Sequence, residues 1–250
     1  MENSHRYHIA KDRLKKLLAP ENGWREFPVR AKPLTTVQAI GQPEGTDYPL
    51  LRGKEVLLEA AVLNGRGQAF TNAPVTFDGT LQEVLDFPLD SNGRRAIFIA
   101  TLNAVLHHLG VAMATVHCRD KEPDQCGPEM GRAVKERHGL VPVGIVGYQP
   151  SIISGCIQEF GKELIRVTDM DTENIGMSRF GIEIWDGVTG TERLMEESKV
   201  LLITGTTFVN GTAFKLLDKA TGKPVYFYGT TAAGMVTLMG YERLCFYGKG

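Results

Sequence analysis

The residues of this chain that could do chemistry fall into two groups. The first is the segment 117–126, HCRDKEPDQC, in which a histidine precedes two cysteines that are separated by seven residues. Imidazole and thiolate groups bind transition metals, so His117, Cys118 and Cys126 are candidate ligands for a heavy or transition metal ion. The Cys-x7-Cys spacing is not that of a zinc finger. A packed or hydrogen-bonded pair near a domain junction is therefore the default interpretation of His117 and Cys118.

Cys126 also has a second interpretation. It directly precedes Gly127 and Pro128, where the sequence predicts that a helix begins. A helix N-terminus lowers the pKa of a nearby thiol. We therefore treat Cys126 as a candidate reactive or metal-binding cysteine.

The second group comprises residues that follow predicted strands. In open parallel sheets, ligands bind beyond the carboxyl ends of the strands, so we expect these residues to converge on one edge of one sheet. Most are small, hydroxyl-bearing, acidic or turn-forming. The candidate ligand-binding residues are Gly147, Tyr148, Gln149, Pro150, Asp171, Asn174, Thr204, Gly205, Thr206, Thr207, Asn210, Gly211, Thr212, Gly229 and Thr230.

Asp169 is a candidate catalytic residue at the same edge. It ends the second strand of the predicted sheet, where a Rossmann-type site keeps an acid for a ribose hydroxyl, and it could act as a general base. A turn or helix-capping aspartate would occupy the same position. The G-x-G-x-x-G fingerprint of dinucleotide sites is absent.

The stretch TGTTFVNGT (204–212) lies between a predicted strand and a predicted helix. Asn210 or Thr212 would cap that helix. The threonines before them need another explanation, and their hydroxyls, with nearby backbone N–H groups, would suit a phosphate or a carboxylate. The stretch is not a Walker A loop, because no lysine follows the glycine.

Asn103 is the other candidate catalytic residue. It lies inside an apolar helix, where a buried amide needs hydrogen-bond partners. Those partners are either neighbouring backbone groups or a ligand in a cleft between two domains. Asn72 and Thr76 would approach the same cleft.

The elements before residue 113 predict a small α+β domain over residues 1–112. Its last helix is apolar on nearly every face and should be buried. The predicted elements are a helix that Ser4 caps and Pro20 stops, strands over 35–41, 55–63 and 68–71, a hairpin turn over 64–67, and the buried helix over 94–110.

Residues 119–138 are dominated by charged side chains and predict a joining region, with a short exposed helix over 127–139. Strands and helices alternate after it, which indicates βαβ units and a parallel sheet. We therefore predict an α/β protein whose second domain, over 113–250, is Rossmann-like. The predicted strands are 140–147, 163–169, 199–205 and 223–229, and the predicted helices are 149–161, 191–198 and 210–222.

The composition narrows the class of protein. The 250 residues have a formal net charge of −1 and are 42% hydrophobic, so no basic excess points to nucleic acid. No apolar stretch is long enough for membrane insertion, and the first residues lack the apolar core of a signal peptide. Four cysteines in a chain this long are not a disulfide framework, which favours a cytoplasmic protein. The segment 191–198 or the charged joining helix would offer a surface for a homo-oligomer.

Several motifs resemble the DUF364 family of heavy-metal chelation proteins and its companion domain, DUF4213. In the first half, RRAIFIATLNAVL (94–106) matches a motif that aligns Arg95 and Asn103, and HCRDKEPDQC resembles a segment that keeps both cysteines. In the second half the resemblance lies in VGIVGYQP (143–150), RVTDMDTENIG (166–176), VLLITGTTFVNGT (200–212) and YGTT (228–231).

The resemblance implies an enolase-N-terminal-like domain followed by a Rossmann-like domain similar to that of methyltransferases, with a site where the two meet. It implies a protein that binds a metal, or a metal-chelating small molecule of flavin-, pterin- or siderophore-like character. Such a protein would catalyse condensation or hydrolysis, or would bind without turnover. The alternative is a nucleotide- or S-adenosylmethionine-dependent transferase that uses the same sheet edge, with Asp169 on a ribose.

Overall fold

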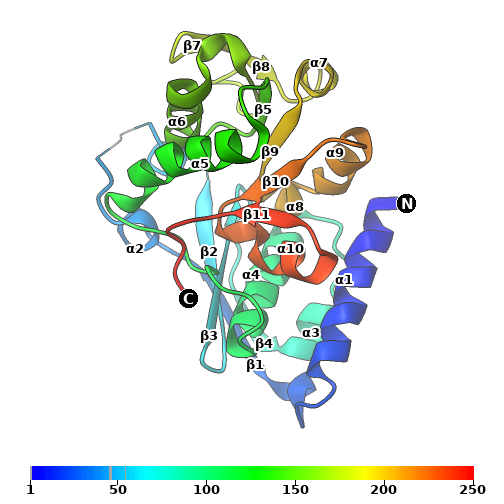
Figure 1. Ribbon diagram of the computed structural model, residues 1–250. Coiled ribbons are helices and arrows are strands. Elements are labelled where there is room, and N and C mark those ends of the chain that lie inside the picture. Colours follow the sequence, from blue (N-terminus) through cyan, green and yellow to red (C-terminus); the bar gives the residue numbers. More distant parts are fainter. Residues whose placement is uncertain (1, 45–46, 54) are drawn as a thin grey trace.

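Figure 1 shows the computed structural model of the chain, which describes residues 2–44, 47–53 and 55–250. The described residues form a four-stranded antiparallel sheet from the first third of the chain and a seven-stranded, mostly parallel sheet from its second half. The α/β class predicted from the sequence is confirmed. None of the helices in the described ranges is long and apolar enough to span a bilayer.

The first sheet has the strand order β3-β2-β1-β4. Along β2, Leu58, Ala60 and Val62 are fully buried, since every second residue of a strand points to the same face. Helix α4 contacts β2 and β3 and covers the sheet. The elements of this part are α1 (Glu2–Leu18), η1 (Trp24–Glu26), β1 (Pro28–Pro33), α2 (Thr36–Ile40), β2 (Val56–Val62), β3 (Gly65–Thr71), β4 (Phe77–Thr80), α3 (Leu81–Asp86) and α4 (Asn92–His108).

Helix α4 approaches β3 closely because β3 carries two glycines at the contact. A Cβ atom at Gly65 would lie 2.1 Å from the Ala104 carbonyl oxygen, and one at Gly67 would lie 2.2 Å from the Ala104 nitrogen. Both glycines therefore belong to the strand. The predicted turn over 64–67 is displaced to Leu63 and Asn64, where Leu63 has a φ of 51°.

The second sheet has the strand order β11-β10-β9-β5-β6-β8-β7. Strand β5 pairs in parallel with β6 on one side and with β9 on the other, so the topological switch point lies between β5 and β9. Only the short β7 pairs antiparallel, with β8. The strands are β5 (Val143–Val146), β6 (Ile165–Asp169), β7 (Ser178–Arg179), β8 (Ile182–Asp186), β9 (Val200–Thr204), β10 (Val225–Tyr228) and β11 (Glu242–Leu244).

Helices cover both faces of this sheet, and alternate residues of β9 face different helices. Val200 and Leu202 pack in the core that includes α5 and α6, whereas Leu201 and Ile203 pack in the core that includes α8 to α10. The helices are α5 (Glu122–His138), α6 (Pro150–Phe160), η2 (Lys162–Leu164), α7 (Thr191–Glu197), α8 (Thr206–Asn210), α9 (Ala213–Lys219), η3 (Thr230–Ala232) and α10 (Ala233–Met239).

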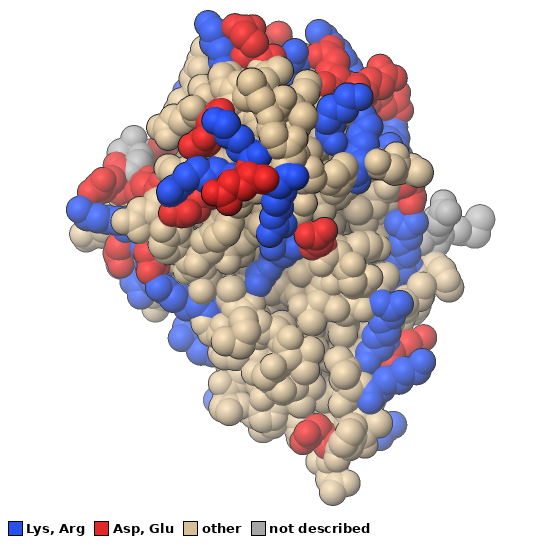
Figure 2. Space-filling view, viewed as in Figure 1, with Lys and Arg blue, Asp and Glu red and all other residues tan. Residues whose placement is uncertain are grey.

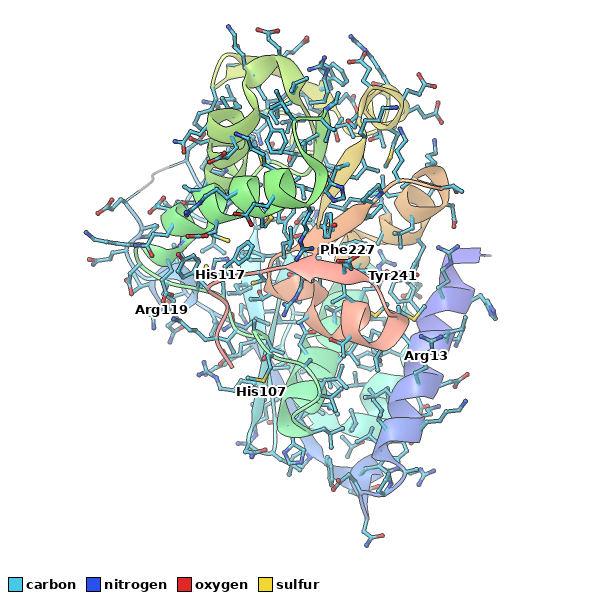
Figure 3. All side chains as sticks on the ribbon, viewed as in Figure 1. Arg13, His107, His117, Arg119, Phe227 and Tyr241 are labelled. Carbon is cyan, nitrogen blue, oxygen red and sulfur yellow. The ribbon has the colours of Figure 1, made fainter. Side chains whose placement is uncertain are left out.

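The second of these cores continues into the first sheet through α1 and α4. The hydroxyl of Tyr7 on α1 donates to the Phe208 carbonyl oxygen at 2.5 Å. Arg13 reaches α10, where its Nη1 donates to the Leu238 carbonyl oxygen at 2.5 Å (Figure 3). The predicted boundary between residues 112 and 113 therefore does not coincide with a break in the core, and it stays a prediction.

A strand was predicted over residues 35–41, but Thr36–Ile40 form helix α2, with Thr35 and Gly41 as its caps. The Thr35 hydroxyl accepts from the Gln38 backbone N–H at 3.3 Å, and the Gln38 side chain accepts from the Thr35 backbone N–H at 3.0 Å. This capping box satisfies two N–H groups that a helix start leaves free, and it outweighs the strand preference of the β-branched residues.

Residues 119–138 are not the exposed joining region that was predicted. Helix α5 begins at Glu122 and packs against α6, where a Cβ atom at Gly127 would lie 1.9 Å from the Ser151 carbonyl oxygen. Its Met130 and Val134 are fully buried. Only the outer face of α5 is charged, and Figure 2 shows Lys and Arg interspersed with Asp and Glu there.

Candidate functional site

A cavity of about 420 Å³ lies at the carboxyl ends of β5, β6, β9 and β10, at the switch point of the parallel sheet. Its opposite wall comes from the first part of the chain and includes Glu55, Phe70 and Asn72. Ligand pockets typically measure roughly 300–1,000 Å³, so a small organic molecule fits this space.

Most of the predicted site residues line this cavity, although their roles stay predictions. Asn103, Pro150 and Gly211 do not line it. Asn72, which was expected near the cleft, lines it, and Thr76 does not. The predicted residues in the cavity wall are His117, Cys118, Cys126, Gly147, Tyr148, Gln149, Asp169, Asp171, Asn174, Thr204, Gly205, Thr206, Thr207, Asn210, Thr212, Gly229 and Thr230.

The loop between β5 and α6 forms part of the cavity floor. Gly147 has a φ of 102°, and a Cβ atom there would lie 2.7 Å from Thr204 Cγ2, so only glycine fits. Gln149 caps α6, because its side-chain oxygen accepts from the Ile152 backbone N–H at 2.7 Å. Pro150 occupies the first turn of that helix and contributes a fixed φ.

The carboxylate of Asp169 holds two loops of the floor together. Its Oδ2 accepts from the Tyr148 backbone N–H at 2.5 Å, and its Oδ1 accepts from the Asp171 backbone N–H at 2.6 Å and from the Asn174 side chain at 3.4 Å. Such charge-assisted bonds are among the strongest in proteins. Asp169 therefore has a structural role that sequence reasoning weighed only as the alternative to a ligand contact.

A polar bridge joins this floor to the first part of the chain. Arg52 Nη1 donates to Asn174 Oδ1 at 3.1 Å, and Arg52 Nη2 lies 3.8 Å from Asp171 Oδ2. On the same side, the Tyr148 hydroxyl donates to Asp47 Oδ2 at 2.5 Å. The loop before β2 is thus fixed to the loops after β5 and β6.

The TGTTFVNGT stretch folds into the end of β9, helix α8 and the turn after it. The Thr207 hydroxyl donates to the Thr204 carbonyl oxygen at 2.6 Å, and Asn210 Oδ1 accepts from both the backbone N–H and the hydroxyl of Thr212. Arg95 Nε donates to the Val209 carbonyl oxygen at 2.6 Å and so caps α8. The structure accounts for much of this motif by local hydrogen bonds.

Two hydroxyls of the cavity wall have no such partner. Thr168 at the end of β6 and Thr230 in η3 are fully buried, and neither Oγ1 atom has a hydrogen-bond partner among the described residues. A buried polar group without a partner costs free energy, so a small side-chain shift that brings either hydroxyl into contact with a bound molecule would be favourable.

Glu55 is an acidic cavity residue that sequence reasoning did not single out. It directly precedes β2 and faces the carboxyl ends of the parallel strands from across the cavity. Burial, with the negative charges of Asp169 and Asp171, raises the pKa of its carboxyl group from 4.5 to about 7. A group that titrates near neutral pH can both donate and accept protons there.

The raised pKa of Glu55 predicts a pH-dependent stability. The folded state favours the protonated acid, so this contribution is full below pH 4.5 and is lost as the pH rises through about 7. The free energy of unfolding should fall over that range by up to about 3 kcal/mol more in the wild type than in Glu55→Gln. Urea unfolding of both proteins at several pH values measures the difference, and parallel curves would contradict it.

Asn103 lies behind the cavity, where it joins the two sheets. Its side-chain nitrogen donates to the Gln68 carbonyl oxygen at 2.8 Å and to the Thr230 carbonyl oxygen at 3.1 Å, and its oxygen accepts from the Gly234 backbone N–H at 2.7 Å. The residue is fully buried. Its partners are therefore backbone groups from both parts of the chain, which was the simpler of the two expectations.

Three thiols meet at one end of the cavity. Cys245, which was not singled out from the sequence, lies in the wall with Cys118 and Cys126. His117 is adjacent to Cys118, and its Nδ1 hydrogen-bonds to the Cys118 carbonyl oxygen at 2.6 Å. Among the described residues, no group of three or more His, Cys, Asp or Glu side chains is arranged to hold a metal ion.

The expected activation of Cys126 by a helix N-terminus is wrong. Helix α5 begins four residues earlier, at Glu122, so Cys126 lies within the helix and not before it. Burial raises the pKa of its thiol to about 12. A metal that bound here would have to displace the proton of a neutral thiol.

The fold and the cavity together define an α/β protein with a ligand-sized site at the switch point of a parallel sheet. The DUF364 family, described as "Putative heavy-metal chelation", matches residues 136–241. This match covers most of the second sheet and none of the first. The predicted DUF4213 companion domain therefore stays a prediction.

Two solved structures from the DUF364 family, both of proteins with unknown function, are similar to this chain. One, from Pyrococcus horikoshii, is 14% identical with a TM-score of 0.47 and covers 90% of this chain and 80% of that one. The other, from Desulfitobacterium hafniense DCB-2, is 15% identical with a TM-score of 0.49 and covers 74% of this chain and 72% of that one. No curated protein matches the sequence.

Proposed function

We propose that the cavity binds a metal-chelating small molecule of flavin-, pterin- or siderophore-like character, in a cytoplasmic protein. The observation that carries the proposal is the cavity itself, which measures about 420 Å³ and is lined by residues from both sheets. The buried hydroxyls of Thr168 and Thr230, two residues of the cavity wall, have no hydrogen-bond partner among the described residues. The description of the matching family supports a link to heavy metals.

We propose that the metal binds as a complex with its chelator and not as a bare ion. The described residues offer no group of three or more ligating side chains, so a bare ion would lack a complete coordination sphere. One or two of the thiols of Cys118, Cys126 and Cys245 would contact a metal whose remaining ligands come from the bound molecule. Soft thiols suit transition metals, which is the class of ion expected from the sequence.

The transferase alternative has less support. It requires Asp169 to hold a ribose hydroxyl, but three N–H groups already occupy this carboxylate. Of the roughly four lone-pair positions of a carboxylate, one is left for a ligand. We therefore favour binding of a chelator over the transferase function.

Calorimetric titration with 4-nitrocatechol, a coloured chelating diphenol, tests the proposal. The probe is titrated alone and as its zinc complex, and zinc alone is the control. We expect the complex to bind more tightly than zinc alone. Tight binding of zinc alone, with no binding of the probe, would contradict a chelator site and favour a bare-metal site.

Two valine variants test whether the cavity hydroxyls hold the probe. Thr168→Val and Thr230→Val are each expected to weaken binding of 4-nitrocatechol by roughly fivefold, the value of one hydrogen bond of about 1 kcal/mol. Neither should lower the melting temperature, because each removes a buried hydroxyl that has no partner. Unchanged affinity in both variants would place the probe elsewhere.

A further inference from the structure

Glu55 is the acidic side chain of the cavity wall that is left available for chemistry. No hydrogen bond joins its carboxylate to another residue in the described part of the chain, whereas the nearby Asp169 is occupied by N–H groups of the loops. Asp171 is also engaged, since its Oδ1 accepts from the Glu173 backbone N–H at 3.0 Å and its Oδ2 faces Arg52. Asp169 and Asp171 therefore stabilise the loops, whereas the carboxylate of Glu55 is left to interact with a bound molecule.

We propose that Glu55 is the base that takes the proton from a chelating hydroxyl of the bound molecule when that hydroxyl binds its metal. The inference rests on the proposed function, because it requires a chelator in the cavity. It goes further by assigning the proton transfer to one residue. The position before β2, across from the ends of β6 and β10, places this carboxylate over the site where ligands of parallel sheets bind.

The surroundings of Glu55 favour this role. The titratable groups that act on it or respond to it are Asp169, Asp171 and the Tyr228 hydroxyl, and none of them brings a positive charge. Burial and the two aspartates raise the pKa of Glu55 to about 7, close to the range in which general bases work best. The acid form is thus favoured after the transfer, and the base form is still populated at neutral pH.

The proposed step is a simple proton transfer. A hydroxyl of the chelator gives its proton to the Glu55 carboxylate, and the oxygen keeps the electron pair of the broken O–H bond and donates it to the metal ion. Glu55 becomes a neutral carboxylic acid. It later returns the proton to solvent, or to the chelator when the metal leaves, so no oxidant or further reactant is consumed.

Stopped-flow mixing of zinc with protein that already carries catechol tests the inference, because the hydroxyls of catechol ionise well above neutral pH and do not themselves produce a midpoint there. The absorbance of the probe changes when its hydroxyls lose their protons, so the rate of the step is read directly. In the wild type we expect this rate to rise with pH, with a midpoint near about 7. Glu55→Gln should slow it by about a hundredfold and remove this midpoint.

Two further variants serve as controls. Glu55→Asp should restore part of the rate, because it keeps a carboxylate at the site. Glu59→Gln, on the same strand β2 but outside the cavity wall, should leave both the rate and its pH dependence as in the wild type. Neither Glu55 variant loses a hydrogen bond to a described residue, so both are expected to fold.

The possible failures are distinguishable. If Glu55→Gln binds the probe and captures zinc at the wild-type rate with the same pH dependence, the role of Glu55 is overturned and the cavity function stands. If the wild type binds neither 4-nitrocatechol nor catechol, both proposals fail together. If Glu55→Gln does not fold, the wild-type profile decides, and a rate without a midpoint near about 7 overturns the inference.

Discussion

Replacing Asn103 with leucine is expected to lower the free energy of unfolding by about 4 kcal/mol. Leucine matches asparagine in length but cannot hydrogen-bond, so the carbonyl oxygens of Gln68 and Thr230 and the N–H of Gly234 would lose this partner in a fully buried place. Each such group costs about 1–3 kcal/mol when it is left unpaired. Urea unfolding measures the change.

The same helix offers a matched control for this prediction. Thr101 is as buried as Asn103, but its hydroxyl has no hydrogen-bond partner in the described ranges. Thr101→Val should therefore leave the free energy of unfolding unchanged or raise it. If both variants lose the same small amount, the Asn103 amide does not hold the two sheets together as the geometry indicates.

Replacing Asp169 with asparagine is expected to cost about 3 kcal/mol of stability, even without a ligand. One carboxylate oxygen becomes an NH2 group, which then faces the backbone N–H of either Tyr148 or Asp171. Two donors in contact repel each other, and the charge that strengthened the remaining bonds is lost. Thermal unfolding of the variant, followed by circular dichroism, measures the change.

Asp186 provides the comparison for Asp169. It ends the neighbouring strand β8, outside the cavity wall, and its Oδ1 accepts from the backbone N–H groups of Val188 at 2.6 Å and Thr189 at 3.3 Å. That turn is exposed, so Asp186→Asn should cost at most about 1 kcal/mol. If Asp169→Asn instead unfolds at the wild-type temperature but binds the probe more weakly, Asp169 contacts the ligand and does not stabilise the loops.

The second half of the fold was largely predictable from the sequence because its signals are local. Continuous apolar runs such as 200–204, each followed by a turn and a helix, leave few arrangements other than a parallel sheet. The first half was less predictable. Strands β1 and β4 lack a continuous apolar run, and a capping box at Thr35 turned an apparent strand into helix α2.

The site was predictable to the extent that topology dictates it. Residues after parallel strands converge whatever their types, which is why Gly147, Asp169 and Thr204 meet in one wall. Glu55 carried a weaker signal. It lies two residues before the fully buried Leu57, on the face of β2 opposite Leu58, but only the packing of one sheet against the other shows that an acid there faces a cavity.

The roles of the polar residues were the least predictable part. An aspartate that holds two loops and one that binds a ligand occupy the same position in a sequence. The distinction rests on the distances between Asp169 and the N–H groups of Tyr148 and Asp171, and these distances depend on a long-range fold. The same holds for Cys126, whose environment follows from where α5 begins.

Helix α4 lies between the two sheets, in contact with β2 and β3 on one side and with α8, η3 and α10 on the other. A core that runs without interruption across α4 leaves no plane along which two lobes could swing apart, since a hinge motion would expose its buried apolar side chains to water. The cavity is thus set in a rigid frame. A ligand would therefore enter and leave the cavity without a swing of one sheet away from the other.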